Sequence, residues 1–568
     1  MLFCKDKSCL IICLVLVSVL VGNLIYNNIQ YEKISFDNND SARELINHSL
    51  ENNDFNNNGV VVEQVIVQLK LGYNDFKASE LCYNYTSNEI DRAKEKQHQL
   101  RCEGYNYHKL RNEKEFKLLD KLGSYKDVYI ASYSPFIELY YDKTYFENNK
   151  YQLLSFLSNI DIVESIRVID SFEYIDNMYV QLFDSGAGTV YNNRTVTGDG
   201  ISIGMLEIGI PDTDNEYLVN TDITIKFDIL NPIKQDDHAT TVALIMAGEN
   251  GVAPDASIYS CFVSGTITNE VEWLVNQGVD VINMSFGEKN PTGYYGEDSC
   301  FVDYIVYTYN VPVVAAVGNY GEEGGLVANP ALGYNVISVG AMDLHGYAED
   351  YSSHETYEEL CKPTICTTGG YFNVEGSEID SIVGTSFTCA LCTGMIALLL
   401  EAQPCLMGDV DRLIALIVAN AEYFNFSGSV EDNGFDYYTG AGRFNYQNII
   451  NNISNSMTIY SSFTEVDDIV YETSIYVQYQ QTLSVSIAVL LRTNGTISNN
   501  RFSDYDIIFL SPRDRVITVV NAWSTTIELL THVAEYSGNY KVRIILGGNV
   551  YFPPNSSVDQ LALAYRIH

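Results

Sequence analysis

The sequence predicts a doubly wound α/β domain, built on a parallel sheet, as the central part of the chain. Three continuous apolar runs, typical of strands that are buried on both faces, support this prediction at residues 279–285, 311–316 and 336–340. Helical patterns fall between them at 269–277 and 301–309. Because buried strands that alternate with helices form a parallel sheet covered by those helices, this region is assigned to the α/β class.

A smaller α+β domain is predicted before the central one, over residues 59–171. Its elements follow the order β-α-β-β-α-β, which is the order of a ferredoxin-like domain. The strands are expected at 60–69, 128–131, 136–141 and 162–168, and the helices at 86–122 and 150–159. An unrelated α+β domain with the same elements is the alternative.

From about residue 456 the pattern changes to short alternating strands with little helix. The strands are separated by polar turns and read LSVSIAVLL, YDIIFLSP, RVITVVNA and YKVRIIL. Such spacing predicts a β-sandwich over residues 456–568. Its Asp504-Tyr505-Asp506 and Gly538-Asn539-Tyr540 segments resemble those of jelly-roll modules.

The first 26 residues predict an export signal. Lys5 and Lys7 precede an apolar run from Cys9 to Val21, which is at the short end for a membrane-spanning helix. The segment is therefore either a cleaved signal peptide or an anchor through residues 9–26, and both place the rest of the chain outside the cell. Residues 27–58 are polar and rich in asparagine, as expected of a linker.

Composition limits the functions that this chain of 568 residues can have. Its hydrophobic content of 46% excludes a disordered protein. Lys and Arg total 33 against 73 Asp and Glu, for a net charge of −40, which argues against nucleic acid as a partner. This acidity suits an exported protein or calcium-binding loops, but no acidic loop has a regular ligand spacing.

The chain has 12 cysteines, most of them after the export signal. Cys361 and Cys366 could form a local disulfide in an oxidising compartment. Cys389 and Cys392 lie in a predicted helix and are expected to be packed core thiols. No His/Cys spacing suggests a zinc site, so the sequence requires no metal.

The motif Gly384-Thr385-Ser386 leads directly into a long helix of small and apolar residues that ends before Pro404. The first N–H groups of a helix have no partner within it and favour negative charge. Ser386 is therefore well placed to be a nucleophile whose reaction builds an oxyanion. A helix start capped by Ser or Thr is the simpler alternative.

Three further residues lie at the ends of predicted elements. Glu207 ends the buried strand in GISIGMLEIGIPD, His238 opens the helix in HATTVALIMAG, and Asn319 ends the apolar run in VPVVAAVGNYG. Active sites of open α/β sheets lie at such ends. An acid, then a histidine, then a serine is also one of the chain orders found in Ser-His-acid hydrolases.

These blocks resemble the subtilisin-like serine peptidases, or subtilases, over roughly residues 195–455. Supporting matches are VINMSFG at 281–287, NPALGYNVISVGAMD and GFDYYTGAGRFN. The sequence departs from the family pattern at four positions. Glu207 replaces the usual aspartate, and Ala239 replaces the glycine that usually follows the histidine. Thr241 replaces the second histidine of that motif, and Ala390 replaces the proline of the serine helix.

The resemblance implies a subtilisin-like catalytic domain over 172–455 and the activity of a serine endopeptidase. Ser386 would attack the peptide carbonyl, His238 would transfer the proton, and Glu207 would orient the imidazole. The side-chain amide of Asn319, with the Ser386 N–H, would bind the oxyanion. Ser285, Phe286 and Gly287, with Ala315 and Ala316, would line the peptide groove and its primary specificity pocket.

The resemblance also implies partners. Protein or peptide substrates are expected, and residues 59–171 resemble the inhibitory propeptide of a self-processed precursor. Calcium is possible as a family property, although the sequence requires no cofactor. Two alternatives stay open: a pseudopeptidase that keeps the fold for binding, and an adhesin-like surface protein whose function lies in residues 456–568.

Overall fold

A computed structural model describes strands at 62–69, 127–130, 136–142 and 163–168, Ala131, single helical residues between 94 and 112, and most of residues 190–568. Within that last range the undescribed residues are 192–193, 227–234, 264–265, 322–323, 344, 358–359, 370–373, 375, 380–382, 425–432, 498–499, 523–524 and 553–555. The predicted export signal, the linker and the helix at 150–159 lie outside the described residues. The chain divides into two compact units: residues 1–70 with 108–170, and residues 71–107 with 171–568.

The first unit contains a four-stranded antiparallel sheet in the order β2-β3-β1-β4. The strands are β1 (Val62–Leu69), β2 (Asp127–Ile130), β3 (Phe136–Asp142) and β4 (Val163–Val168), all within two residues of the predicted bounds. The helical residue Asn112 donates a hydrogen bond of 2.7 Å from Nδ2 to the carbonyl oxygen of Ala131, just after β2.

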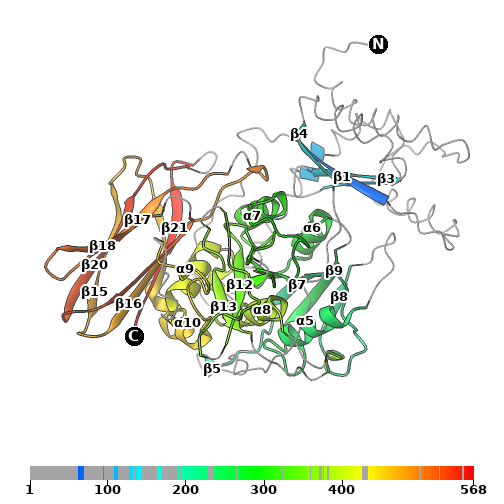
Figure 1. Cartoon of the computed structure of the whole chain (residues 1–568), viewed down its shortest axis with the longest axis horizontal. Coiled ribbons are helices and arrows are strands. Elements are labelled where there is room, and N and C mark those ends of the chain that lie inside the picture. Colours follow the sequence, from blue (N-terminus) through cyan, green and yellow to red (C-terminus); the bar gives the residue numbers. More distant parts are fainter. Residues whose placement is uncertain are drawn as a thin grey trace, which may run out of the picture. The chain divides into compact units, whose positions relative to one another are not determined.

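The second unit is built on a seven-stranded sheet in the order β13-β12-β11-β10-β7-β9-β8, and all its strand pairs are parallel (Figure 1). Every residue of β10, β11 and β12 is buried, as their unbroken apolar sequences predict. The bounds are β7 (Ser202–Glu207), β8 (Ile223–Ile225), β9 (Ser257–Phe262), β10 (Val281–Met284), β11 (Val313–Ala316), β12 (Ile337–Met342) and β13 (Ile365–Thr368). The predicted parallel α/β class is confirmed.

Helices connect these strands and pack on the sheet. Gly278 and Asn310 end two of them in the left-handed conformation, with φ of 87° and 51°. The helices are α5 (Asp237–Ala247), α6 (Thr268–Gln277), α7 (Glu297–Tyr309), α8 (Thr385–Ala402), α9 (Val410–Asn420) and α10 (Tyr446–Asn452). A short hairpin of β5 (Val190–Tyr191) and β6 (Arg194–Thr195) precedes β7.

Helix α8 is buried along its whole length. It packs against α5 and against strands on both sides of the sheet centre, from β7 to β13. Among the described helices it is the one long and apolar enough to cross a bilayer, but its complete burial identifies it as the core helix of the α/β part.

The strand order reverses between β7 and β10, because successive strands extend from this pair toward opposite edges. In open α/β sheets, ligands bind beyond the carboxyl ends of the strands at such a point. Glu207 is the last residue of β7, and Ser285 follows β10 directly. The fold therefore places the predicted site residues where this class of sheet has its site.

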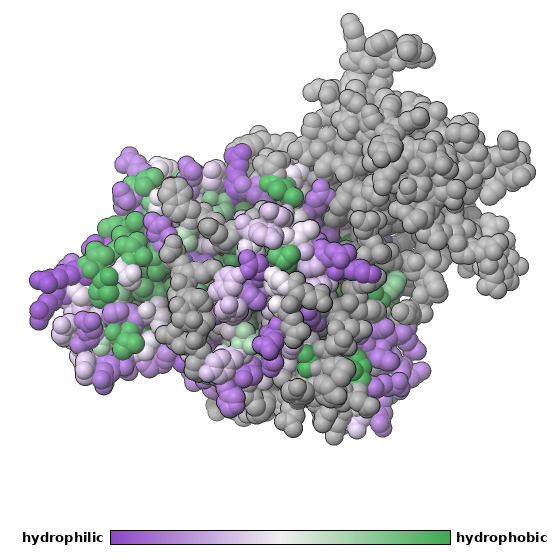
Figure 2. All heavy atoms as spheres, in the orientation of Figure 1, coloured by the Kyte–Doolittle hydropathy of each residue, from purple (hydrophilic) through white to green (hydrophobic). Residues whose placement is uncertain are grey.

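Residues 456–568, here named the C-terminal β region, form two four-stranded antiparallel sheets that share one hydrophobic core. The orders are β14-β21-β16-β19 and β15-β20-β17-β18. The bounds are β14 (Ser456–Ser461), β15 (Ile469–Val477), β16 (Thr482–Ala488), β17 (Tyr505–Leu510), β18 (Val516–Val520), β19 (Ile527–Val533), β20 (Gly538–Leu546) and β21 (Asp559–Ile567). Figure 2 shows hydrophobic residues on its surface, and the exposed ones include Ile469, Tyr476, Val516, Ile517 and Val519.

Candidate active site

Glu207 and His238 are in direct contact. Glu207 ends β7 and is fully buried, and His238 lies in the first turn of α5. The Asp236 carboxylate caps this helix by accepting hydrogen bonds from the backbone N–H groups of His238 (3.0 Å) and Ala239 (3.3 Å). This cap fixes the start of α5, and His238 Nδ1 then lies 3.2 Å from Glu207 Oε2.

Burial and the contact with His238 have opposite effects on the pKa of Glu207. Burial raises the pKa of the Glu207 carboxyl, while the charge of His238 and the hydrogen bond to it lower that pKa again. Thr241 replaces the second histidine of the family motif, and its hydroxyl bonds to Asp237 O at 2.8 Å and to Ser377 Oγ at 2.7 Å. The side chain at this position is therefore held away from the acid–imidazole pair by its own partners.

Ser386 is the second residue of α8, after Gly384, whose φ of 150° suits only glycine. Its Oγ donates to Ser285 O at 3.0 Å, and Ser285 Oγ donates to Ser386 O at 2.8 Å. This reciprocal pair joins the helix start to the end of β10. On the other side, the ring of Phe387 lies 5.1 Å from the ring of His238, centroid to centroid.

If Ser386 is to give its proton to His238, its hydroxyl must leave the Ser285 carbonyl oxygen and turn toward the imidazole. Catalytic hydrogen bonds of this kind are often long or misaligned without substrate and tighten when it binds.

Asn319 is oriented by Thr385, a residue whose separate role the sequence reasoning missed. Asn319 Oδ1 accepts hydrogen bonds from Thr385 N (2.8 Å) and Thr385 Oγ1 (3.0 Å), and Gly318 N donates to the same hydroxyl at 3.1 Å. The amide oxygen is thereby bound, and Nδ2 lies on the side of Gly384, 3.1 Å from where a Cβ there would be. The sequence signal that could have indicated this contact is the hydroxyl of Thr385, which directly precedes the predicted nucleophile.

The predicted groove residues lie on the same edge of the sheet. Ser285, Phe286 and Gly287 follow β10, and Met284 pairs with Ala315 of β11. Ala315 and Ala316 are fully buried within β11. Two side chains that the sequence reasoning did not single out lie nearby: Glu288, which follows Gly287, and Tyr320, whose hydroxyl donates to Lys289 O at 2.6 Å.

The predicted disulfide between Cys361 and Cys366 is wrong. All seven cysteines of the described region are free thiols. Cys366 lies within β13 and is buried in the α/β core, whereas Cys361 Sγ lies 3.0 Å from Asn433 Nδ2 and 3.6 Å from Ile527 O of the C-terminal β region. Cys366 lies in β13 and Cys361 in the segment before it, and their side chains have different neighbours. Cys389 and Cys392 are confirmed as buried core thiols.

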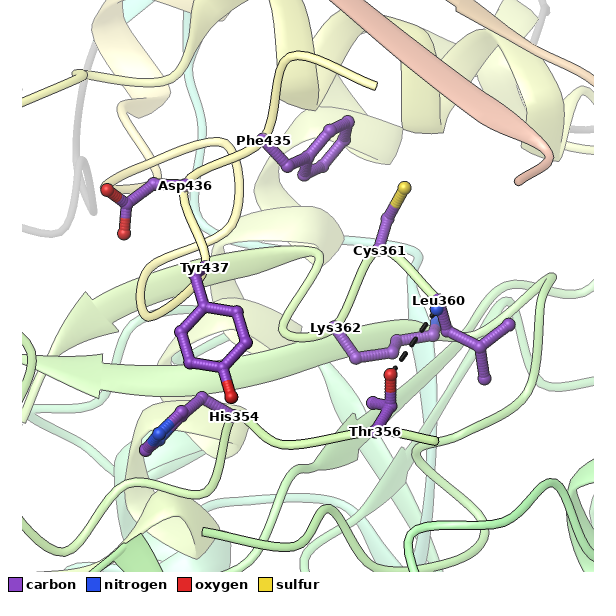
Figure 3. Close-up of a pocket in the computed structure, with 8 residues that line it drawn as sticks. All are labelled: His354, Thr356, Leu360, Cys361, Lys362, Phe435, Asp436 and Tyr437. Atoms are coloured by element: carbon purple, nitrogen blue, oxygen red, sulfur yellow. Dashed lines mark hydrogen bonds between the residues drawn. The ribbon is translucent and has the colours of Figure 1, made fainter. Parts of the chain in front are cut away.

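A cavity of about 210 Å³ lies in the α/β part, and none of the predicted site residues lines it (Figure 3). It is lined by His354, Thr356, Leu360, Cys361, Lys362, Phe435, Asp436 and Tyr437. Among the described residues, no group of three or more His, Cys, Asp or Glu side chains could hold a metal ion.

The parallel sheet carries an acid–imidazole pair, and a helix that begins with a serine, at the point where its strand order reverses. This arrangement defines the class: an α/β protein of the serine-hydrolase type. Residues 175–442 match the model of the subtilase family. Subtilisin DY of Bacillus licheniformis is 30% identical over 231 residues, which covers 38% of this chain and 82% of that protein. The chain therefore belongs to the subtilase family, a family of serine-type endopeptidases.

Other similar proteins extend the comparison. A "Probable subtilase-type serine protease" of Deinococcus radiodurans is 33% identical over 236 residues, which is 36% of this chain but only 31% of that protein. The self-cleaved protease domain of PatA is 25% identical, with a TM-score of 0.37, over 45% of this chain and 97% of that domain. The chain thus spans about a third of the length of the Deinococcus protein.

Proposed function

We propose that this protein is a secreted or surface-anchored serine endopeptidase that uses a Ser386-His238-Glu207 triad. The observation that carries the proposal is the 3.2 Å contact between Glu207 and His238, beside a serine at the start of a buried helix. Named relatives of the family are serine proteases, and the match to subtilisin DY covers 82% of the length of that subtilisin.

The contacts suggest how each residue would act. His238 Nε2 would take the Ser386 proton as Oγ attacks the peptide carbonyl, and would later give that proton to the leaving amine. Glu207 would accept the Nδ1–H, hold the productive tautomer and stabilise the imidazolium. The Glu207 carboxylate is fully buried, so it is shielded from bulk solvent.

Asn319 and the first turn of α8 would stabilise the oxyanion. The Asn319 amide is already oriented by Thr385, so it needs no rearrangement when negative charge develops on the substrate oxygen. The Ser386 backbone N–H at the helix start would be the second donor. Loss of one such donor typically lowers the rate by about 10²–10³.

Labelling with a fluorophosphonate tests the proposal, because only an activated serine reacts with it. We expect one covalent adduct on the folded protein, located at Ser386 by peptide mass spectrometry. The Ser386→Ala variant and heat-denatured wild type should stay unlabelled. A folded, mature protein that does not react would contradict the peptidase function and favour a pseudopeptidase that binds without cleaving.

We further propose that residues 59–171 are an inhibitory propeptide, removed by the enzyme itself. Two residues of the expected helix 86–122 support this proposal, because they pack on the α/β part within the same unit. Arg101 Nη2 donates to Val279 O at 2.6 Å, and Lys94 Nζ lies 2.9 Å from Asp280 Oδ2. The start of the catalytic domain is separately fixed, because Glu401 Oε2 accepts from the backbone N–H groups of Thr197 and Gly198.

Cleavage is therefore expected after β4 and before the anchored residues, in the segment SFEYIDNMYVQLFDSGAGTVYNN. In the Ser386→Ala variant the precursor should stay intact, because its nucleophile is missing. Intact mass and N-terminal sequencing of both proteins measure this result. If the variant is processed like the wild type, another protease makes the cut and self-processing is refuted.

A further inference from the structure

Glu288 lies next to the candidate active site and has no role in the proposed chemistry. It comes three residues after Ser285, whose carbonyl oxygen contacts Ser386 Oγ. Three residues of extended chain span about 10 Å. The Glu288 backbone therefore lies within about 10 Å of the residue that contacts the candidate nucleophile, a distance that a long substrate side chain can span.

The chemistry of the reaction indicates which side of the substrate faces Glu288. The leaving amine must lie near His238, because that residue gives it a proton. The carbonyl oxygen must lie near Asn319 Nδ2. The residue on the acyl side of the scissile bond then extends away from His238, toward the segments that follow β10 and β11.

Three segments border the same region beside Asn319. Tyr320 directly follows Asn319, and its side chain reaches the segment after β10, where its hydroxyl donates to Lys289 O at 2.6 Å. Glu288 N donates to Asn329 O at 3.1 Å, and Ala328 N donates to Val317 O at 2.9 Å. The extensions of β10 and β11 are thus joined through residues 328–329, with Glu288 at the junction.

The Glu288 carboxylate is held in a fixed position. Its Oε1 accepts hydrogen bonds from Thr292 N (3.0 Å) and Asn329 Nδ2 (3.2 Å). Asn329 is itself fixed, because its Oδ1 accepts from Gly296 N at 2.9 Å and from Ser299 Oγ at 2.6 Å. In the part of the chain that the structure describes, no lysine or arginine forms an ion pair with Glu288.

Among the described residues, this carboxylate has two hydrogen-bond donors and no cationic partner. Glu288 is half-buried, and burial raises the pKa of its carboxyl, which shows that desolvation disfavours the ionised form. An apolar substrate side chain placed here would bury the carboxylate further without supplying a countercharge, which costs free energy. A guanidinium or ammonium group would instead form charge-assisted hydrogen bonds.

We propose that Glu288 makes the enzyme select peptides with arginine or lysine on the acyl side of the scissile bond. The inference rests on the proposed peptidase function and names its substrate class. Arginine should be preferred over lysine, because its planar fork can bind a carboxylate through two N–H groups.

The test uses mature protein and a set of fluorogenic peptides that differ only in that residue: Arg, Lys, Gln, Leu or Glu. The wild type should cleave the Arg peptide with at least about tenfold higher kcat/KM than the Leu peptide, as expected from one charge-assisted hydrogen bond. Glu288→Gln should remove most of this ratio by lowering kcat/KM for Arg and Lys only. Glu288→Lys should reverse the order of the Arg and Glu peptides.

Glu535→Gln is the matched control, because it removes the same charge from an exposed position in the C-terminal β region. Its selectivity should equal that of the wild type. A wild type that cleaves the Leu peptide as well as the Arg peptide would overturn the inference without any variant, and so would an unchanged ratio in Glu288→Gln. Absence of both fluorophosphonate labelling and cleavage of every peptide would instead refute the peptidase function itself.

Discussion

Glu207→Gln is expected to lower kcat/KM by about 10³–10⁴ while the protein still folds. The amide has the shape of the carboxylate, but it cannot carry the charge that stabilises the imidazolium. Its NH₂ group can also donate to His238 Nδ1, which would favour the wrong tautomer. The measurement is peptide hydrolysis by mature enzyme, with circular dichroism and thermal unfolding to show that the fold is kept.

Two carboxylate variants are the controls for this result. Glu207→Asp should be intermediate, because β7 and α5 here hold His238 at 3.2 Å from the longer side chain. Asp212→Asn should stay near wild-type activity, because Asp212 Oδ1 accepts from Asp214 N in its own loop and from Gln235 Nε2, just before α5. If Asp212→Asn inactivates the enzyme and Glu207→Gln does not, the triad acid has been assigned to the wrong residue.

The α/β part was predictable because its local patterns and its global packing agree. The run Val311–Ala316 is apolar throughout, and β11 is buried on both faces in a parallel sheet. Gly278 and Pro404 mark helix ends that the structure places at Gln277 and Ala402. Each signal depends on a few neighbouring residues, so one sequence is enough to find it.

The site was predictable in part, because its chemical residues lie at the ends of those elements. Glu207 and His238 were expected together, and the structure brings them into contact. The sequence did not single out Thr385, Glu288 or Tyr320, whose contacts lie around these residues in the structure. Their contacts depend on how three loops approach one another, and no local pattern encodes that approach.

The prediction of the Cys361–Cys366 disulfide was wrong for a related reason. A separation of five residues between Cys361 and Cys366 suggests proximity, but the side-chain directions depend on where β13 begins. The strand sends Cys366 into the α/β core, while Cys361 faces the C-terminal β region. The change of pattern at residue 456 likewise says nothing about the contacts made across it.

These contacts join the C-terminal β region to the α/β part through buried groups. Helix α9 packs against β14, β16 and β21, and its residues Leu413 and Leu416 are fully buried. Asn335 Nδ2 donates to Leu491 O at 2.9 Å, and Leu491 N donates to Asn335 Oδ1 at 2.7 Å, with all these groups buried. Arg566 Nη1 donates to the carbonyl oxygens of Asn420 and Ala421, where α9 ends.

Truncation after Asn455 is therefore expected to prevent the catalytic domain from folding, which would remove both fluorophosphonate labelling and peptide hydrolysis. Each large apolar side chain that loses its cover forfeits about 1.5–3 kcal/mol, and a few such losses equal the stability of a typical domain. Soluble yield, thermal unfolding and labelling of the fragment measure the effect. A milder test is Asn335→Ala, which leaves the Leu491 backbone groups buried without partners and should cost about 1–3 kcal/mol of unfolding free energy. Val519→Thr, on the exposed face of β18, should be nearly neutral. A truncated protein that labels and unfolds like the wild type would show that the α/β part is stable alone, and the buried contacts would then serve only to hold the C-terminal β region in place.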